Sequence, residues 1–149
     1  MEIKGENGGT LANATKKGKK KAPPRAHTAS RLMQWPCQMQ LISSHAPCFD
    51  GANLLIAADC TAFAYADFHS RFMKNHITLI GCPRLDAGDY TEKLSEIIKN
   101  NDIKSIKVVR MDAPCCAQTE SAVINAIRES QKDIPLTVAL ISTDGKVIG

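Results

Sequence analysis

The feature that most constrains this chain is a series of short, unbroken apolar runs separated by stretches with helical periodicity. From residue 35 onward the runs are continuous rather than alternating, as in LLIAA, ITLIG and LTVALI. Strands that are buried on both faces of a parallel sheet have this pattern. We therefore expect strands over residues 38–43, 53–59, 77–82, 105–111 and 136–142.

Helical patterns fill the intervals between these runs. Apolar side chains recur there at spacings of three and four residues, and Asp89 and Glu92 have the spacing of a capping box. We expect helices over residues 61–75, 89–101 and 116–131, and a turn at 143–146 before a short last strand. Strands that alternate with helices form βαβ units. The sequence predicts a three-layer α/β domain of flavodoxin-like or Rossmann-like type, with a mostly parallel sheet of about four to six strands.

The charge divides the chain into two parts. Residues 1–31 carry eight Lys and Arg against two Glu, a net charge of +6, whereas residues 32–149 carry eleven basic and thirteen acidic side chains, a net charge of −2. The first part has almost no bulky apolar side chains, so burial cannot offset the entropy cost of ordering it. We predict a disordered basic tail or linker over 1–31 and a single domain over 32–149, which suits a chain of 149 residues.

The composition of the chain limits its partners and its compartment. The basic run KKGKKKAPPR is a solvated linker or binds an acidic partner, and because no aromatic side chains are interleaved with its lysines we expect no nucleic-acid partner. No apolar stretch of about 20 residues spans a membrane, and no apolar segment at the start resembles a signal peptide. We expect a cytoplasmic protein, in which the six cysteines stay reduced.

Four of the six cysteines follow predicted strands. Cys60 follows the strand 53–59, Cys82 ends the strand 77–82, and the pair Cys115 and Cys116 comes a few residues after the strand 105–111. The carboxyl ends of parallel strands share one edge of the sheet, and ligands of open α/β sheets bind outside that edge. Four thiols from three separate loops can therefore converge on one site.

Clustered thiolates in a reduced cell favour a soft metal. Four cysteines can hold an iron–sulfur cluster or zinc, and the alternative is that these thiols are buried apolar side chains that bind nothing. The adjacent pair can also act as a redox-active dithiol. We expect packing roles for Cys37 and Cys48, a surface or hydrogen-bonded role for His69, and helix caps at Asp59 and Asp86 in preference to an electrostatic role beside the thiols.

Several segments of the chain resemble a family of iron–sulfur proteins of anaerobic bacteria and archaea. The resemblance covers residues 30–149 and includes the segments RLMQWPCQMQLI, ANLLIAADCTAFAYADFH, ITLIGCPRLD, YTEKLSEIIKNNDIKSIKVVRMDAPCC and IPLTVALISTDGK. Members of that family carry two ferredoxin-type [4Fe–4S] motifs before a C-terminal domain. The resemblance implies that this chain corresponds to the C-terminal domain.

The chain departs from that family at two places. It contains no CxxCxxC motif and no cysteine before Cys37, so the ferredoxin module is absent from it. Ala117 follows the cysteine pair, where the CCG motifs of heterodisulfide reductase have glycine. Any redox role must therefore depend on the four cysteines or on a separate partner that carries the clusters.

Three functional hypotheses follow from these observations. The first is an iron–sulfur or other metal-binding module with a redox or electron-transfer role, in which Cys60, Cys82, Cys115 and Cys116 are the ligands and the cofactor is an iron–sulfur cluster, with zinc as the alternative. The second is a metal-free interaction domain that docks on a redox partner protein such as a ferredoxin. The third is a redox enzyme that uses Cys115 or Cys116.

Overall fold

A computed structural model of the chain describes residues 28–149. Its centre is a sheet of four parallel strands, β1 (Asn53–Ala58), β2 (Ile77–Gly81), β3 (Ser105–Met111) and β4 (Leu136–Ile141), in the order β2-β1-β3-β4. Leu54 pairs with Ile77 on one side and with Ile106 on the other. The predicted parallel α/β sheet is confirmed, and four of the five predicted strands are present.

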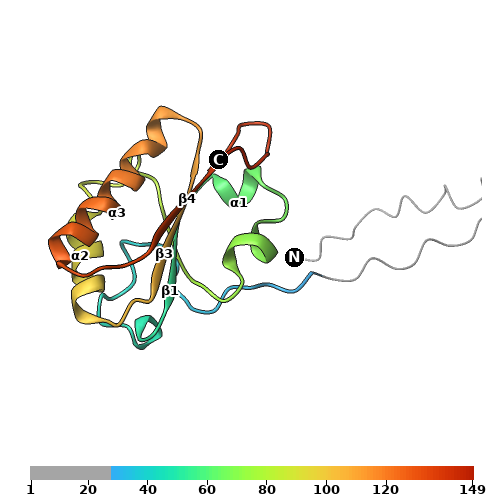
Figure 1. The fold of residues 1–149 in the computed structure, drawn as a ribbon. Helices are drawn as coiled ribbons and strands as arrows, with labels where there is room; N and C mark the ends of the chain where they lie inside the picture. The colour runs from blue at the N-terminus through green and yellow to red at the C-terminus, as the bar shows by residue number, and fades with distance from the viewer. Residues whose placement is uncertain (1–27) are drawn as a thin grey trace, which may run out of the picture.

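Helices cover both faces of the sheet and complete three layers (Figure 1). α2 (Thr91–Asn100) and α3 (Ala117–Ser130) lie together on one face, and α1 (Thr61–Ala64) with the short π-helix η3 (His69–Met73) lies on the other. Successive residues of β1 alternate between two apolar clusters: Leu54 and Ile56 pack on the α2–α3 side, and Leu55 and Ala57 on the α1 side. This alternation explains the unbroken apolar runs, because both faces of each inner strand are buried.

Two predicted elements differ from the structure. The predicted strand 38–43 is wrong, because only Gln38 makes a bridge, to Ile80, and Met39 and Ile42 are buried at a spacing of three residues while Leu41 is exposed. The predicted helix 61–75 is interrupted: α1 ends at Ala64, and Tyr65 has extended backbone. The aromatic side chains that follow α1 give this segment its helical pattern. They belong in part to the separate π-helix η3, in which Phe72 is buried.

Both edges of the sheet are covered by irregular chain. At the β2 edge, the Met39 amide donates to the Ile80 carbonyl at 2.9 Å, and the Gln34 side chain hydrogen-bonds to the backbone of Thr78. At the β4 edge, Val147 bridges back to Ile141 after a turn, which confirms the predicted turn at 143–146. These contacts occupy backbone groups that would otherwise be free to pair with another chain.

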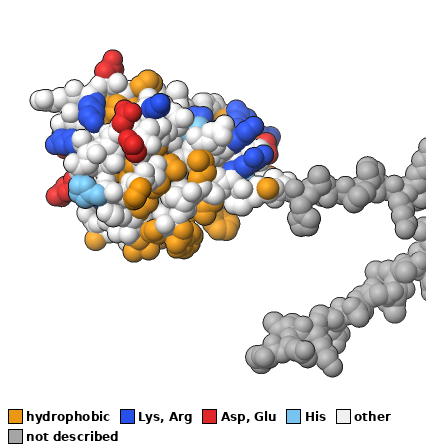
Figure 2. Space-filling model, turned by 90° about the horizontal axis from the view of Figure 1, so that it is seen from below, with side chains coloured by type: hydrophobic (Ala, Val, Ile, Leu, Met, Phe, Trp, Pro, Cys, Tyr) orange, Lys and Arg blue, Asp and Glu red, His pale blue; other side chains and the backbone are white. Residues whose placement is uncertain are grey.

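The surface of the described domain carries several large apolar side chains. Seen from below, hydrophobic side chains gather in one area, and acidic and basic side chains occupy other parts of the same face (Figure 2). The most exposed are Phe63 (94%), Leu85 (83%) and Trp35 (80%). Within residues 28–149, no helix has the length and hydropathy needed to cross a membrane.

The turn after β4 contacts α1 through Gly145. The φ of Gly145 is +84°, and a Cβ there would lie 2.4 Å from the Ala64 carbonyl oxygen. Gly88 has nearly the same φ, +85°, with open space around it, so it is a matched control. In urea unfolding, Gly88→Ala should lower the free energy of unfolding by about 1 kcal/mol, and Gly145→Ala by about 1–3 kcal/mol more. Equal losses for the two variants would contradict the contact between the turn and α1.

Candidate functional site

The candidate site lies at the carboxyl edge of the sheet, where the chain reverses its direction of winding. From β1 the chain adds β2 on one side and then returns to place β3 on the other, so the switch point lies between β1 and β3. Crevices for ligands form outside this point in open α/β sheets. The loops that leave β1 and β3 there carry Cys60, Cys115 and Cys116.

Three cysteines lie in the loops at the switch point. Cys60 is the residue before α1 and is exposed. Cys115 is exposed and Cys116 is buried, both within a 3₁₀ turn (Pro114–Cys116) that leads directly into α3. The Cys116 side chain packs in the apolar cluster on the α1 side of the sheet. The site therefore combines two accessible thiols with one that is shielded from water.

The environment of Cys116 disfavours its thiolate. Burial raises the pKa of the Cys116 thiol, and the thiols of Cys115 and Cys60 raise it further, whereas a hydrogen bond from the Met111 backbone lowers it. Since the thiolate is the nucleophile in thiol chemistry, the raised pKa disfavours Cys116 as a nucleophile at neutral pH. Cys60 contributes to this shift although it comes from a different loop.

Cys82 lies in a different group of side chains. It follows β2, is half-buried and contributes to the raised pKa of Tyr90, which packs in the core on the α2–α3 side of the sheet. The Tyr90 hydroxyl donates a hydrogen bond to Asp86 and packs over Gly81, where a Cβ would lie 2.5 Å from the hydroxyl oxygen. Burial and the neighbouring Asp86 raise the pKa of Tyr90, so its hydroxyl stays protonated.

Asp59 lies between these two groups, immediately before Cys60. Its amide donates to the Gly81 carbonyl at 3.1 Å, but its Oδ1 atom is shielded from solvent and has no hydrogen-bond partner within the described residues. Burial raises the pKa of Asp59, and the charge of Asp86 raises it further. A carboxyl group held in this way is a candidate proton donor or acceptor at the carboxyl edge.

The predicted metal ligands are not arranged as a preformed metal site. Across residues 28–149, no three His, Cys, Asp or Glu side chains lie where together they could hold a metal ion. Cys60 and Cys115 contribute to the raised pKa of Cys116, whereas Cys82 contributes to the raised pKa of Tyr90. Binding of a metal by all four thiols would require side chains or loops to move.

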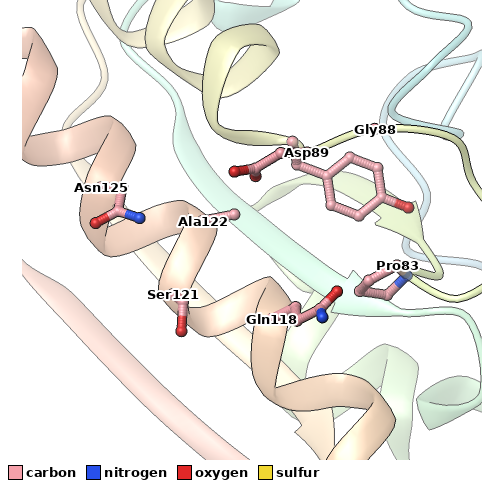
Figure 3. Close-up of a pocket in the computed structure, with 8 residues that line it drawn as sticks. Pro83, Gly88, Asp89, Gln118, Ser121, Ala122 and Asn125 are labelled. Carbon is pink, nitrogen blue, oxygen red and sulfur yellow. The ribbon is translucent and has the colours of Figure 1, made fainter.

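A cavity of about 360 Å³ opens beside this edge, between the loop after β2 and α3 (Figure 3). Gln118, Ser121 and Asn125 line it from successive turns of α3, and Asp89 and Pro83 line it from the loop. Its lining includes one carboxylate and no cationic side chain. The cavity adjoins the cysteine loops, because Pro83 follows Cys82 and Gln118 is the second residue after Cys116.

The other predicted residues have mostly structural roles. Cys48 packs against the core, and burial raises the pKa of its thiol. Cys37 is half-buried, and its carbonyl oxygen accepts a hydrogen bond from the Ile80 amide at 2.9 Å. His69 accepts a hydrogen bond from the Arg31 amide at 3.1 Å, as expected for a hydrogen-bonded surface histidine. Residues 1–27 of the predicted basic tail (1–31) lie outside the described residues. The acidic or ferredoxin-type partner expected for the tail therefore stays a prediction.

The predicted helix caps at Asp59 and Asp86 are wrong. α1 has no side-chain cap, and the Asp86 carboxylate accepts from Tyr90 instead. The residue that hydrogen-bonds at the start of α2 is Asp89, whose Oδ1 accepts from the Thr91 amide at 2.9 Å. The sequence predicts Asp89 at the start of that helix as part of a capping box. Its side chain instead accepts from the amide two residues further along the chain, as in an Asx turn.

The comparisons with known proteins identify the domain family. A Rossmann-like domain family matches residues 46–149, more than half of the chain. The chain belongs to this family. It is also 31% identical over 117 residues to an uncharacterized protein of Archaeoglobus fulgidus, which covers 78% of this chain and 82% of that protein. No solved structure matches. Neither match names a ferredoxin-type iron–sulfur protein, so that resemblance stays a prediction.

The pKa of Asp59 predicts how the stability of the domain depends on pH. Because folding raises this pKa, the folded state binds more protons than the unfolded chain between about 3.9 and the higher folded value. This contribution to stability is present at low pH and is lost as the pH rises through the folded pKa. Asp59→Asn should therefore raise the free energy of unfolding at pH 7, by less than about 1 kcal/mol because water still reaches part of the side chain.

Urea unfolding at several pH values between 4 and 7 tests this expectation. The stabilising effect of Asp59→Asn should shrink as the pH falls, and the exposed control Asp102→Asn should show no comparable trend. A variant less stable than the wild type at pH 7 would contradict the unfavourable environment of Asp59.

Proposed function

We propose that this domain is a thiol-based redox protein, with Cys60, Cys115 and Cys116 as its working groups. The observation that supports the proposal most strongly is the placement of three cysteines from two loops at the switch point, two of them exposed and the third with a raised pKa. Cys115 is the attacking thiol because it is exposed, whereas burial and the neighbouring thiols hold the pKa of Cys116 above its usual value.

The proposed reaction is the reduction of a disulfide substrate. The Cys115 thiolate attacks one substrate sulfur, the substrate S–S bond breaks, and the first substrate thiolate leaves and takes up a proton. The Cys60 thiol then loses its proton and attacks the Cys115 sulfur, which releases the second substrate thiol. The substrate gains two electrons, and the protein is left with a Cys60–Cys115 disulfide.

Cys60 completes this reaction more readily than Cys116 for a geometrical reason. The Cα atoms of adjacent residues are about 3.8 Å apart, less than the roughly 4.4–6.8 Å usual across a disulfide. A bond between the two neighbouring cysteines would therefore be strained. Cys60 comes from another loop and does not have this constraint. In this scheme Cys116 is the shielded neighbour that remains a thiol.

Oxidation with hydroxyethyl disulfide tests the redox proposal. The wild type should lose two free thiols, and peptide mapping by mass spectrometry should find Cys60 joined to Cys115. Cys60→Ser should accumulate a mixed disulfide on Cys115, Cys115→Ser should abolish the reaction at this edge, and Cys37→Ser should behave as the wild type. If Cys115→Ser loses the same two thiols as the wild type, the proposal is wrong.

A second candidate function is the binding of an iron–sulfur cluster or zinc by Cys60, Cys82, Cys115 and Cys116. It is favoured by the origin of these four cysteines at the ends of three neighbouring strands, β2, β1 and β3. The loops would hold the metal through thiolates and adjust its potential through hydrogen bonds and burial. This function requires Cys82, which the thiol redox proposal does not use.

Reconstitution under anaerobic conditions with iron and sulfide, and separately with zinc, distinguishes the two functions. Cluster binding predicts a brown protein with near-stoichiometric iron and sulfide, both lost in Cys82→Ser, whereas a zinc site predicts a colourless protein that retains zinc. If the wild type binds neither, or if Cys82→Ser binds as much as the wild type, the four-thiolate site is excluded. The disulfide of the redox proposal should form equally well in Cys82→Ser.

A further inference from the structure

One ion pair joins the strand that precedes the cysteine pair to the helix that follows it. Arg110 is the second-last residue of β3, and Glu120 lies in the first turn of α3. The Arg110 Nε atom is 2.7 Å from Glu120 Oε2, and the two side chains are 18% and 30% exposed. Within residues 28–149 no other ion pair links two elements, since the pair of Lys146 and Asp144 lies inside one exposed turn.

The same guanidinium also holds the end of β3. Arg110 Nη1 donates to the Met111 carbonyl at 3.2 Å, and the Met111 backbone lowers the pKa of the Cys116 thiol. The side chain of Arg110 thus contacts the end of the strand and the first turn of the helix, and the loop between them contains Cys115 and Cys116. The ion pair therefore bridges the two ends of that loop, from the last residues of the strand to the first turn of the helix.

The rest of the loop is held by backbone hydrogen bonds and apolar packing. Neither the 3₁₀ turn nor α3 has a side-chain cap at its start. Its hydrogen bonds are between backbone groups: the Asp112 amide donates to Ile141 at 2.8 Å, and the Cys116 amide to Ala113 at 3.1 Å. Cys116 and Ala113 also pack in the apolar cluster on the α1 side. Glu120 also places a negative charge near the positive end of the α3 dipole, which favours its position there.

We propose that the Arg110–Glu120 ion pair is a positioning device that sets the spacing of the Cys115–Cys116 thiols relative to Cys60. The inference rests on the proposed thiol function and assigns two residues to it that touch no substrate. Charge-assisted hydrogen bonds are short and directional, so they fix geometry as well as charge. Loss of either partner should therefore change the spacing of the thiols without removing any thiol.

Phenylarsine oxide is a probe of this spacing that needs no oxidation. Its arsenic forms bonds to two thiols, which lose their protons as the arsenic oxygen leaves as water, so its affinity depends on how closely the two sulfurs can approach. Glu120→Gln keeps the size of the side chain and removes its charge. We expect this variant to bind the arsenical about tenfold more weakly than the wild type. Lys146→Met breaks the exposed ion pair and is the matched control, with unchanged affinity.

A second readout separates positioning from simple stabilisation of the fold. The equilibrium constant of the Cys60–Cys115 disulfide in a glutathione redox buffer should change by about tenfold in Glu120→Gln, under conditions where urea unfolding shows that both proteins are fully folded. Arg110→Met should have a similar effect, and the double variant should be no worse than either single variant, since both remove the same interaction.

The outcomes distinguish this inference from the proposed redox function. If the wild type forms no disulfide, the redox proposal fails, and the arsenical affinities still decide whether the ion pair positions the thiols. If folded Glu120→Gln matches the wild type within about twofold in arsenical affinity, well below the change expected for a lost charge-assisted bond, the positioning inference is overturned. Should Arg110→Met fail to fold, Glu120→Gln alone gives the answer.

Discussion

The parallel hydrogen-bonded register of the four strands is the constraint on which the rest of this structure depends. The register pairs Ala58 with Gly81 and places the last residues of β1, β2 and β3 along one edge. Residues separated by more than fifty positions in the chain, such as Cys60 and Cys116, are thereby placed at the same edge of the sheet. No local motif is needed for this, because the sheet itself supplies the proximity.

The sequence predicts the sheet well because burial on both faces leaves a strong signal. The strand expected over 105–111 is found over Ser105–Met111, and the other three inner and edge strands differ by one residue at one end. The segment 38–43 has the apolar composition of a strand but not its structure. Its apolar side chains, such as Met39 and Ile42, are buried because the segment covers the β2 edge and packs on the core. For the same reason the sequence predicts one helix over 61–75: buried apolar side chains recur there, although the structure has two short helices, α1 and η3.

The candidate site could be predicted only in part. Its location follows from the strand ends, but the division of the cysteines into three interacting thiols and a separate Cys82 depends on side-chain packing. Tyr90 packs against Gly81 and holds Asp86 beside the loop that carries Cys82, and nothing in the spacing of these residues indicates that contact. Arg110 did leave a signal, because a charged residue near the end of a buried strand requires a partner. That partner, Glu120, is ten residues away.

The two faces of the sheet give the carboxyl edge two different chemical environments. On the α1 side, Cys116 packs among apolar side chains and its thiol is kept neutral. On the α2–α3 side, the Tyr90 hydroxyl donates to the Asp86 carboxylate, and Tyr90 lines a polar cavity. Asp59 precedes Cys60, and its Oδ1 atom has no hydrogen-bond partner among residues 28–149, an arrangement that opposes stability. Groups with pKa values shifted by burial and a neighbouring charge, as in Asp59, concentrate at functional sites, which makes the carboxyl edge the candidate site of this domain.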